Sequence, residues 1–230
     1  MESLYLIILL LSFSIPFAYS FEKKMLFIQH WKAVFSAITI VAIVYIVWDV
    51  IFTKIGVWGF NPTYYLGVTF FNLPLEEILF FFLIPYASIF IHYSIQHFFP
   101  KAKLSNKFVV PFTWVFIALL VVLIAMNMGK LYTQINGFFL VFALLLGLLD
   151  KNKTLHRFYI SYLVILIPFA IVNGILTGSF IDDPVVWYNN AENVGIRFFT
   201  IPVEDFGYAF SMLYFSVLLI ERFKLKQEKF

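Results

Sequence analysis

Long apolar runs separated by short polar connections make up most of this chain. Seven runs carry few or no charged residues: roughly 3–20, 33–52, 74–99, 108–127, 131–149, 158–178 and 202–220. A helix needs about 20 apolar residues to cross the hydrocarbon layer of a bilayer, and these runs have about that length. They are continuous, whereas the strands of a membrane barrel alternate apolar and polar residues. The pattern predicts an all-α integral membrane protein with seven transmembrane helices.

The composition agrees with this class and narrows the chemistry. Hydrophobic residues make up 62% of the 230 residues and charged residues 13%, about half the charged fraction of an ordinary soluble domain. The chain starts Met1-Glu2-Ser3 and so lacks the basic residues that open a signal peptide, which favours a first transmembrane helix. There is no cysteine, which excludes disulfides, thiolate metal sites and a cysteine nucleophile.

The distribution of Lys and Arg predicts the orientation in the membrane. Basic residues gather in the cytoplasmic connections of membrane proteins. Connections 21–32, 100–107 and 150–157 hold three each and the tail after residue 220 holds four, whereas the opposite connections hold three in total. This asymmetry predicts a multi-pass protein of the cell membrane with its N-terminus outside and its C-terminus in the cytoplasm.

One segment of the chain occurs twice. Residues 67–82 and 195–210 align without a gap at an offset of 128. The matching positions include a glycine, a pair of phenylalanines, a proline and two adjacent acids. The acids are Glu76 and Glu77 in the first copy and Glu204 and Asp205 in the second. An internal duplication is the simplest cause of such a match.

The seven-helix prediction explains how the copies are arranged. Both acidic pairs stand at the start of a helix that runs from outside to inside, so the repeats are parallel. A three-helix unit copied directly would arrive inverted, and one further helix restores its direction. We therefore predict one membrane domain over 1–230, with a first repeat at 1–99, a linker helix at 108–127 and a second repeat at 131–230.

The duplicated acids are candidates for proton chemistry. A proline followed by an acid is also an ordinary helix start, because a carboxylate favours the positive end of the helix dipole. A start signal does not need two adjacent acids, however, and a charge at the centre of a bilayer costs about 2.5 kcal/mol or more. Burial and a like-charged neighbour both favour the neutral acid. A neutral carboxylic acid in an apolar pocket is a proton donor.

Aromatic and polar residues near the acids are candidates for binding a substrate. Aromatic faces stabilise a nearby cation by about 2 kcal/mol once water is excluded, although most phenylalanines in such a chain face lipid or pack helices. The aromatic candidates are Phe70, Phe80, Phe81, Phe198 and Tyr208. Asp49 and Asn173 occupy comparable places in the two repeats. They could orient the carboxyl groups or accept the proton, or form hydrogen bonds between helices.

The motifs Pro74-Leu75-Glu76-Glu77 and Pro202-Val203-Glu204-Asp205, with the run from Asn173 to Thr177, resemble the membrane-integral lycopene cyclase family in its fused two-repeat form. The resemblance implies a lycopene β-cyclase, an isomerase of the intramolecular lyase type. Such an enzyme protonates the linear ψ end group of lycopene and closes a β-ionone ring without redox change.

The resemblance also implies the partners and the site. No cofactor or metal is needed, and the partners are the apolar polyene and the lipid bilayer, with no nucleic acid. By motif match the catalytic role falls on Glu76, Glu77, Glu204 and Asp205, with the proton donor among them left open. The number of rings formed, the ring isomer and the oligomeric state are open too.

Three alternatives compete with this interpretation. A carotenoid end-group hydratase of the same fold would quench the same cation with water. A proton-coupled transporter would use intramembrane acids to load and release protons. A magnesium-dependent prenyltransferase is disfavoured, because Asp182-Asp183 is the only Asp pair and Pro184 follows it in a predicted loop.

Overall fold

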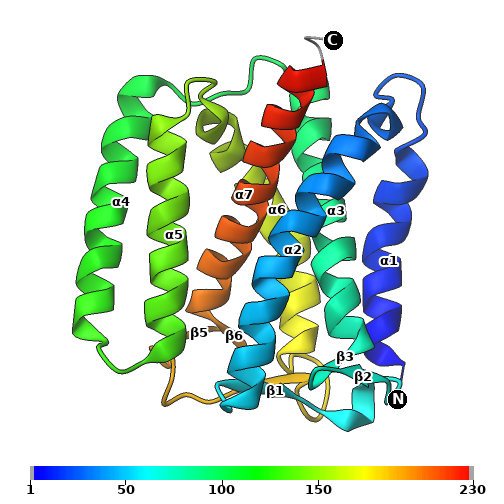
Figure 1. Ribbon diagram of the computed structural model, residues 1–230, viewed down its shortest axis with the longest axis vertical. Coiled ribbons are helices and arrows are strands. Elements are labelled where there is room, and N and C mark those ends of the chain that lie inside the picture. Colours follow the sequence, from blue (N-terminus) through cyan, green and yellow to red (C-terminus); the bar gives the residue numbers. More distant parts are fainter. Residues whose placement is uncertain (1–2, 228–230) are drawn as a thin grey trace.

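The computed structural model describes residues 3–227, and in that part of the chain seven α-helices form one bundle (Figure 1). The predicted ends of the domain at residues 1 and 230 lie outside it. The helices are α1 (Leu4–Tyr19), α2 (Trp31–Lys54), α3 (Leu75–Phe98), α4 (Asn106–Met126), α5 (Leu131–Leu149), α6 (Thr154–Leu176) and α7 (Val203–Gln227). Each coincides with one of the seven apolar runs.

Six of these helices are long and apolar enough to cross a membrane among the described residues. Helix α1 is shorter, with 16 residues, and it lies beside α3 (Figure 1). Since helices satisfy all their backbone hydrogen bonds internally, such a bundle suits hydrocarbon. The chain is therefore an integral membrane helical protein, and the transmembrane position of α1 stays a prediction.

The connections at one end of the bundle contain short strands that the apolar pattern did not predict. Figure 1 shows all of them at the end where the N-terminus lies, which we name the strand end. Three antiparallel pairs form: β1 (Trp58–Phe60) with β4 (Val186–Tyr188), β2 (Thr69–Phe70) with β3 (Leu73–Pro74), and β5 (Arg197–Phe198) with β6 (Ile201–Pro202). Short helices η1 (Phe27–His30) and η2 (Pro62–Tyr64) complete the connections.

The backbone repeats itself along with the sequence. Hairpin β2–β3 leads into α3, and hairpin β5–β6 leads into α7 at the same offset of 128 residues. Gly67 and Gly195 open the two segments at φ angles of 80° and 82°, which glycine adopts without the cost a Cβ imposes. Phe71 and Phe199 also lie in the left-handed region, at 51° and 54°. The duplication therefore includes the loops as well as the helices.

Strands β1 and β4 join the two halves of the chain. Trp58 pairs with Tyr188 and Gly59 pairs with Trp187. A Cβ atom on Gly59 would lie 2.4 Å from Cζ2 of Trp187, so the close approach of the ring requires glycine at this position. The ladder covers the bundle at its strand end.

Helix α7 lies in the middle of the bundle, whereas α4 lies at its edge against α5 (Figure 1). Hydrogen bonds between buried side chains connect the helices. Tyr45 of α2 and Ser211 of α7 are 2.7 Å apart, and His92 of α3 and Ser161 of α6 are 2.7 Å apart. Such bonds add to packing, because two apolar helices gain little from leaving lipid for one another. The bundle thereby fixes how α2, α3, α6 and α7 are rotated.

Candidate active site

An elongated cavity of about 410 Å³ lies inside the bundle, between α1, α3, α6 and α7. Strands β1 and β4 contribute to its wall at the strand end. Three carboxyl groups line it, from Asp49, Glu77 and Asp205. Most of the other lining side chains are apolar, apart from a group of tyrosines next to the acids. We name this space the acidic cavity.

The first acid group lies on α3 and α2. Tyr5 of α1 donates a hydrogen bond of 2.5 Å to Oε2 of Glu77. Trp58 donates its indole N–H to Oδ1 of Asp49. Oδ2 of Asp49 is buried and receives no hydrogen bond from an N–H or hydroxyl group of the described residues.

The two carboxyl groups of this first group are neighbours. Asp49 and Glu77 both line the acidic cavity, where their side chains lie close enough to interact. Two neighbouring carboxylates repel one another in a buried space, which favours a pair that carries one proton. Both residues are buried, Asp49 at 1% exposure and Glu77 at 8%. Asp49 and Glu77 therefore form a pair that holds a proton away from water.

The second acid group has different partners. Tyr132 of α5 donates to Oδ1 of Asp205 at 2.5 Å. At Oδ2, Asn173 donates at 2.8 Å and Tyr188 at 3.0 Å. Both oxygens of Asp205 thus accept hydrogen bonds from neutral donors, an arrangement that stabilises an ionised carboxylate.

Tyr188 lies in β4, outside the membrane-spanning helices, and remains a hydrogen-bond donor. Burial raises the pKa of its hydroxyl well above the usual value, and the negative charge of the nearby Asp205 raises it further. Tyrosine is already protonated at neutral pH with its usual pKa of about 10. The Tyr188 hydroxyl therefore keeps its proton and donates a hydrogen bond to the Asp205 carboxylate.

The first acid of each duplicated pair has another role. Oε1 of Glu76 accepts the backbone N–H of Leu66 at 2.8 Å, and Oε1 of Glu204 accepts that of Val194 at 2.7 Å. These bonds are related by the same offset of 128 and tie each preceding loop to its helix. Neither residue lines the acidic cavity. Successive helical side chains point about 100° apart, so adjacent acids do not face one space.

The structure does not bring all four duplicated acids into one cavity. The structure brings Glu77 and Asp205 together and adds Asp49, whereas Glu76 and Glu204 turn toward the loops. The ordinary helix-start interpretation fits Glu76 and Glu204, and the proton-chemistry interpretation fits the second acid of each pair.

The predicted substrate-binding residues divide in the same way. Phe80, Tyr208, Asn173 and Asp49 line the acidic cavity.

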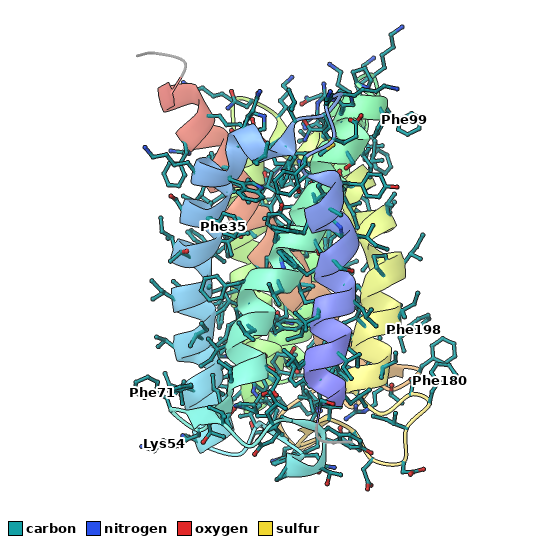
Figure 2. The ribbon with its side chains drawn as sticks, turned by 90° about the vertical axis from the view of Figure 1, so that its right-hand side faces the viewer. Phe35, Lys54, Phe71, Phe99, Phe180 and Phe198 are labelled. Atoms are coloured by element: carbon teal, nitrogen blue, oxygen red, sulfur yellow. The ribbon has the colours of Figure 1, made fainter. Side chains whose placement is uncertain are left out.

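Phe81 does not line the cavity, because it is 1% exposed and packs among other buried side chains behind it. Phe70 and Phe198 are each 50% exposed, on β2 and β5. Figure 2 shows Phe198 and the hairpin residue Phe71 projecting from opposite sides of the bundle. A strand turns alternate side chains to opposite faces, so closeness to the acids in sequence did not place these rings in the cavity.

Several tyrosines of the site were not identified from the sequence. Tyr5 and Tyr132 contact the second acid of the first and second pair respectively. They lie near the starts of α1 and α5 and are 127 residues apart, one residue from the offset of the motifs. A comparison of the two repeats over their whole length could have found them. Tyr188 has no such signal, because its strand is paired only in the folded protein.

Beyond the acids the acidic cavity is long and apolar. Its lining on α3 extends from Glu77 to Ile91, which corresponds to about 21 Å at 1.5 Å per residue. Leu11 and Ile15 of α1 line it and are also 66% and 65% exposed on the outside of the bundle. Figure 2 looks onto α1, with α3 and α6 on its two sides. The cavity therefore reaches the lipid-facing surface beside α1.

The two halves of the chain match one family model. That model, described as lycopene cyclase, matches residues 2–95 and 129–223. The ends of the matched segments are 128 residues apart, the offset that relates the motifs. Helix α4 lies in the unmatched stretch between them. Searches of curated proteins and of solved structures returned no match.

Proposed function

Since the chain belongs to the lycopene cyclase family, we propose that it is a lycopene β-cyclase, an isomerase that closes the linear ψ end groups of lycopene into β-ionone rings. The observation that carries this proposal is the acidic cavity. It places the carboxyl groups of Asp49, Glu77 and Asp205 in one buried and otherwise apolar space. A hydrocarbon can enter such a space, and a proton donor stands at its end.

Ring closure needs an acid that protonates the end group, a cavity that folds the polyene, and protection of the cation from water. A carboxylic acid adds a proton to C2 of the end group, which leaves a tertiary cation at C1. The C5–C6 double bond attacks C1, the ring closes, and the cation moves to C5. Loss of the proton on C6 then gives the β-ring. The proton gained equals the proton lost, so the reaction is an isomerisation.

The cavity supports each of these needs. General acid catalysis contributes about 10²- to 10⁴-fold, and the remainder must come from folding the polyene and stabilising the cation. Phe80 and Tyr208 line the cavity near the acids, where aromatic faces stabilise a cation once water is excluded. The ladder of β1 and β4 covers this end.

The shape of the cavity suggests how the polyene lies. Its acid end is closed by strands, and its apolar end meets the lipid beside α1. We place one end group of lycopene against the acids and the polyene along α3 toward the opening. Pro16 of α1 and Pro168 of α6 line the cavity, and a proline inside a helix removes a backbone bond and bends it. With one acid end, the cavity accommodates one end group at a time.

Expression in cells that accumulate lycopene tests the proposal. Red cells turn orange-yellow if rings form, and chromatography of the extracted pigments identifies β-rings. A hydroxylated linear product would instead show a hydratase. Unchanged lycopene, with the protein confirmed in the membrane, would contradict the cyclase and favour proton-coupled transport. An Asp183→Asn variant is the control, since Asp183 is an exposed loop acid.

The orientation and the repeat boundaries belong to the same proposal. Only three of the Lys and Arg residues that the structure describes, Lys54 at the end of α2, Lys130 and Arg197, lie at the strand end. By the positive-inside rule the end with few basic residues is outside the cell. A reporter active only in the cytoplasm should work when fused after α7 and fail when fused before α1. The opposite pattern would reverse the membrane orientation.

A further inference from the structure

The two halves of the acidic cavity differ in what their carboxyl groups contact, and we propose that this difference divides the reaction between them. Glu77 and Asp49 together hold the proton that starts the reaction. Asp205 is the carboxylate that faces the cation and takes the proton from the ring. This assignment rests on the proposed cyclase function.

The donor assignment follows from the contacts of the first half. Tyr5 donates to Oε2 of Glu77, and Trp58 donates to Oδ1 of Asp49. One oxygen of each carboxyl group therefore already accepts a hydrogen bond, and the other oxygen is left to carry a proton. Glu77 and Asp49 are neighbours in the acidic cavity, and Oδ2 of Asp49 has no hydrogen-bond partner among the described residues. Two like charges side by side are unfavourable, so such a pair shares one proton.

The acceptor assignment follows from the contacts of the second half. Tyr132, Tyr188 and Asn173 give Asp205 three hydrogen bonds, at both of its oxygens. All three partners can donate, and an ionised Asp205 accepts all three hydrogen bonds at the same time. The ionised form is therefore the one that these contacts fit. A fixed carboxylate opposite a developing cation stabilises the transition state without further rearrangement.

The sequence of steps balances. The proton of the pair formed by Glu77 and Asp49 goes to C2 of the end group, and the pair becomes doubly ionised. The C1–C6 bond forms, and the proton on C6 passes to the Asp205 carboxylate. Between turnovers Asp205 releases that proton to water and the pair takes up one proton from water, so the proton added to the next end group comes from the solvent. No electron carrier takes part, and the enzyme ends as it began.

Deuterium uptake distinguishes the two roles. Membranes containing the wild type or a variant are incubated with lycopene in D₂O, and the recovered carotenoids are examined by mass spectrometry. The wild type should place one deuterium in each ring formed. Asp205→Asn should lower ring formation more than 100-fold and still label the lycopene or linear products, because the cation forms and returns. Glu77→Gln should lower ring formation equally and label nothing beyond membranes without the protein.

The outcomes separate this proposal from the cyclase function. No rings from the wild type would overturn the cyclase itself. With an active wild type, label in Glu77→Gln but not in Asp205→Asn would reverse the roles, and label in neither variant would remove the division. The Asp183→Asn control should match the wild type in ring formation and label.

A second variant keeps the test valid if Asp205→Asn fails to accumulate in the membrane. Tyr188→Phe removes one of the three donors to Asp205 and leaves the carboxyl group in place. It should lower ring formation roughly tenfold while label uptake continues. A loss of label uptake in Tyr188→Phe would overturn the assignment of Asp205 as the acceptor. Asp205→Glu should restore part of the ring formation with a changed ratio of ring isomers.

Discussion

Glu77 and Asp205 stand at the same position of the two repeats, 128 residues apart, yet their surroundings differ. Glu77 meets the acid Asp49, whereas Asp205 meets the amide of Asn173. Asp49 and Asn173 lie near the strand ends of α2 and α6 and are 124 residues apart, one helical turn from the offset of the motifs. A tyrosine donates to each second acid in both halves, at 2.5 Å. The duplication thus supplied two similar carboxyl sites, and an acid in one and an amide in the other made them different.

The largest expected effect comes from removing either second acid. Glu77→Gln or Asp205→Asn should abolish ring formation, lowering it by at least 10²-fold, since one general acid or base contributes 10²- to 10⁴-fold. Pigment chromatography in lycopene-accumulating cells measures the loss, with the amount of protein in the membrane as the control. Full activity in both variants would remove these residues from the mechanism.

An exchange of the two distinguishing residues sharpens the comparison. Asp49→Asn makes the first half resemble the second and removes the acid that shares a proton with Glu77. Hydrogen bonds to charged groups contribute about 1.5–3 kcal/mol, so ring formation should fall by roughly 10- to 150-fold. Adding Asn173→Asp should restore part of it, because the second half then has the acid pair. An inactive double variant that is folded would show that the halves are not interchangeable.

The tyrosines offer a smaller, matched pair of changes. Tyr132→Phe removes one of three donors to Asp205, and Tyr5→Phe removes the donor to Glu77. We expect about a tenfold loss for Tyr132→Phe, where the partner is an ionised carboxylate, and a smaller loss for Tyr5→Phe, because hydrogen bonds to charged groups are stronger. Initial rates in isolated membranes measure both. Equal losses would argue that Glu77 and Asp205 carry the same charge.

The ladder that joins the halves can be broken without touching the acids. Gly59→Ala places a Cβ against the ring of Trp187 and should lower the free energy of unfolding by about 1–3 kcal/mol, the usual cost of overpacking. Thermal unfolding in detergent measures the loss of stability, with the fraction of protein that stays monodisperse recorded at each temperature. Adding Trp187→Ala should recover part of the stability. No recovery would show that Trp187 is not the source of the strain.

The smallest effect is expected for the first acid of each pair. Glu76→Gln and Glu204→Gln keep a side-chain oxygen that can accept the N–H of Leu66 or Val194. Ring formation should stay within a few-fold of the wild type, with a stability change of about 0.5–1.5 kcal/mol. A folded Glu76→Gln variant that forms no rings would return Glu76 to the catalytic machinery. The measurement is the rate of ring formation in Glu76→Gln compared with the rate in Glu77→Gln.

Much of the architecture followed from the sequence because its causes are local. A run of about 20 apolar residues must form a helix in hydrocarbon, and all seven runs are helical among the described residues. The duplication was visible because both copies kept their spacing, and the family match covers the same two segments. The transmembrane status of α1 and the repeat boundaries remain predictions.

The site could be predicted only in part, because contacts between helices depend on their rotation. The sequence indicated that Glu77 and Asp205 take part in proton chemistry and that Asp49 and Asn173 lie near them. The structure brings all four to one cavity. The sequence offered no way to separate Glu77 from Glu76, because both carry the same group at adjacent positions. The direction in which each points depends on how α3 packs against α1, α2 and α6.

The sequence by itself determined the helices, the duplicated motif and the residue types available for proton transfer, since hydrophobic length and repeat spacing are properties of the chain alone. Only the tertiary structure decided that Asp49 meets Glu77, that Tyr132, Tyr188 and Asn173 meet Asp205, and that Glu76 and Glu204 hold loops. The physical reason is that each of these contacts joins different segments of the chain, and packing fixes which faces of the helices meet.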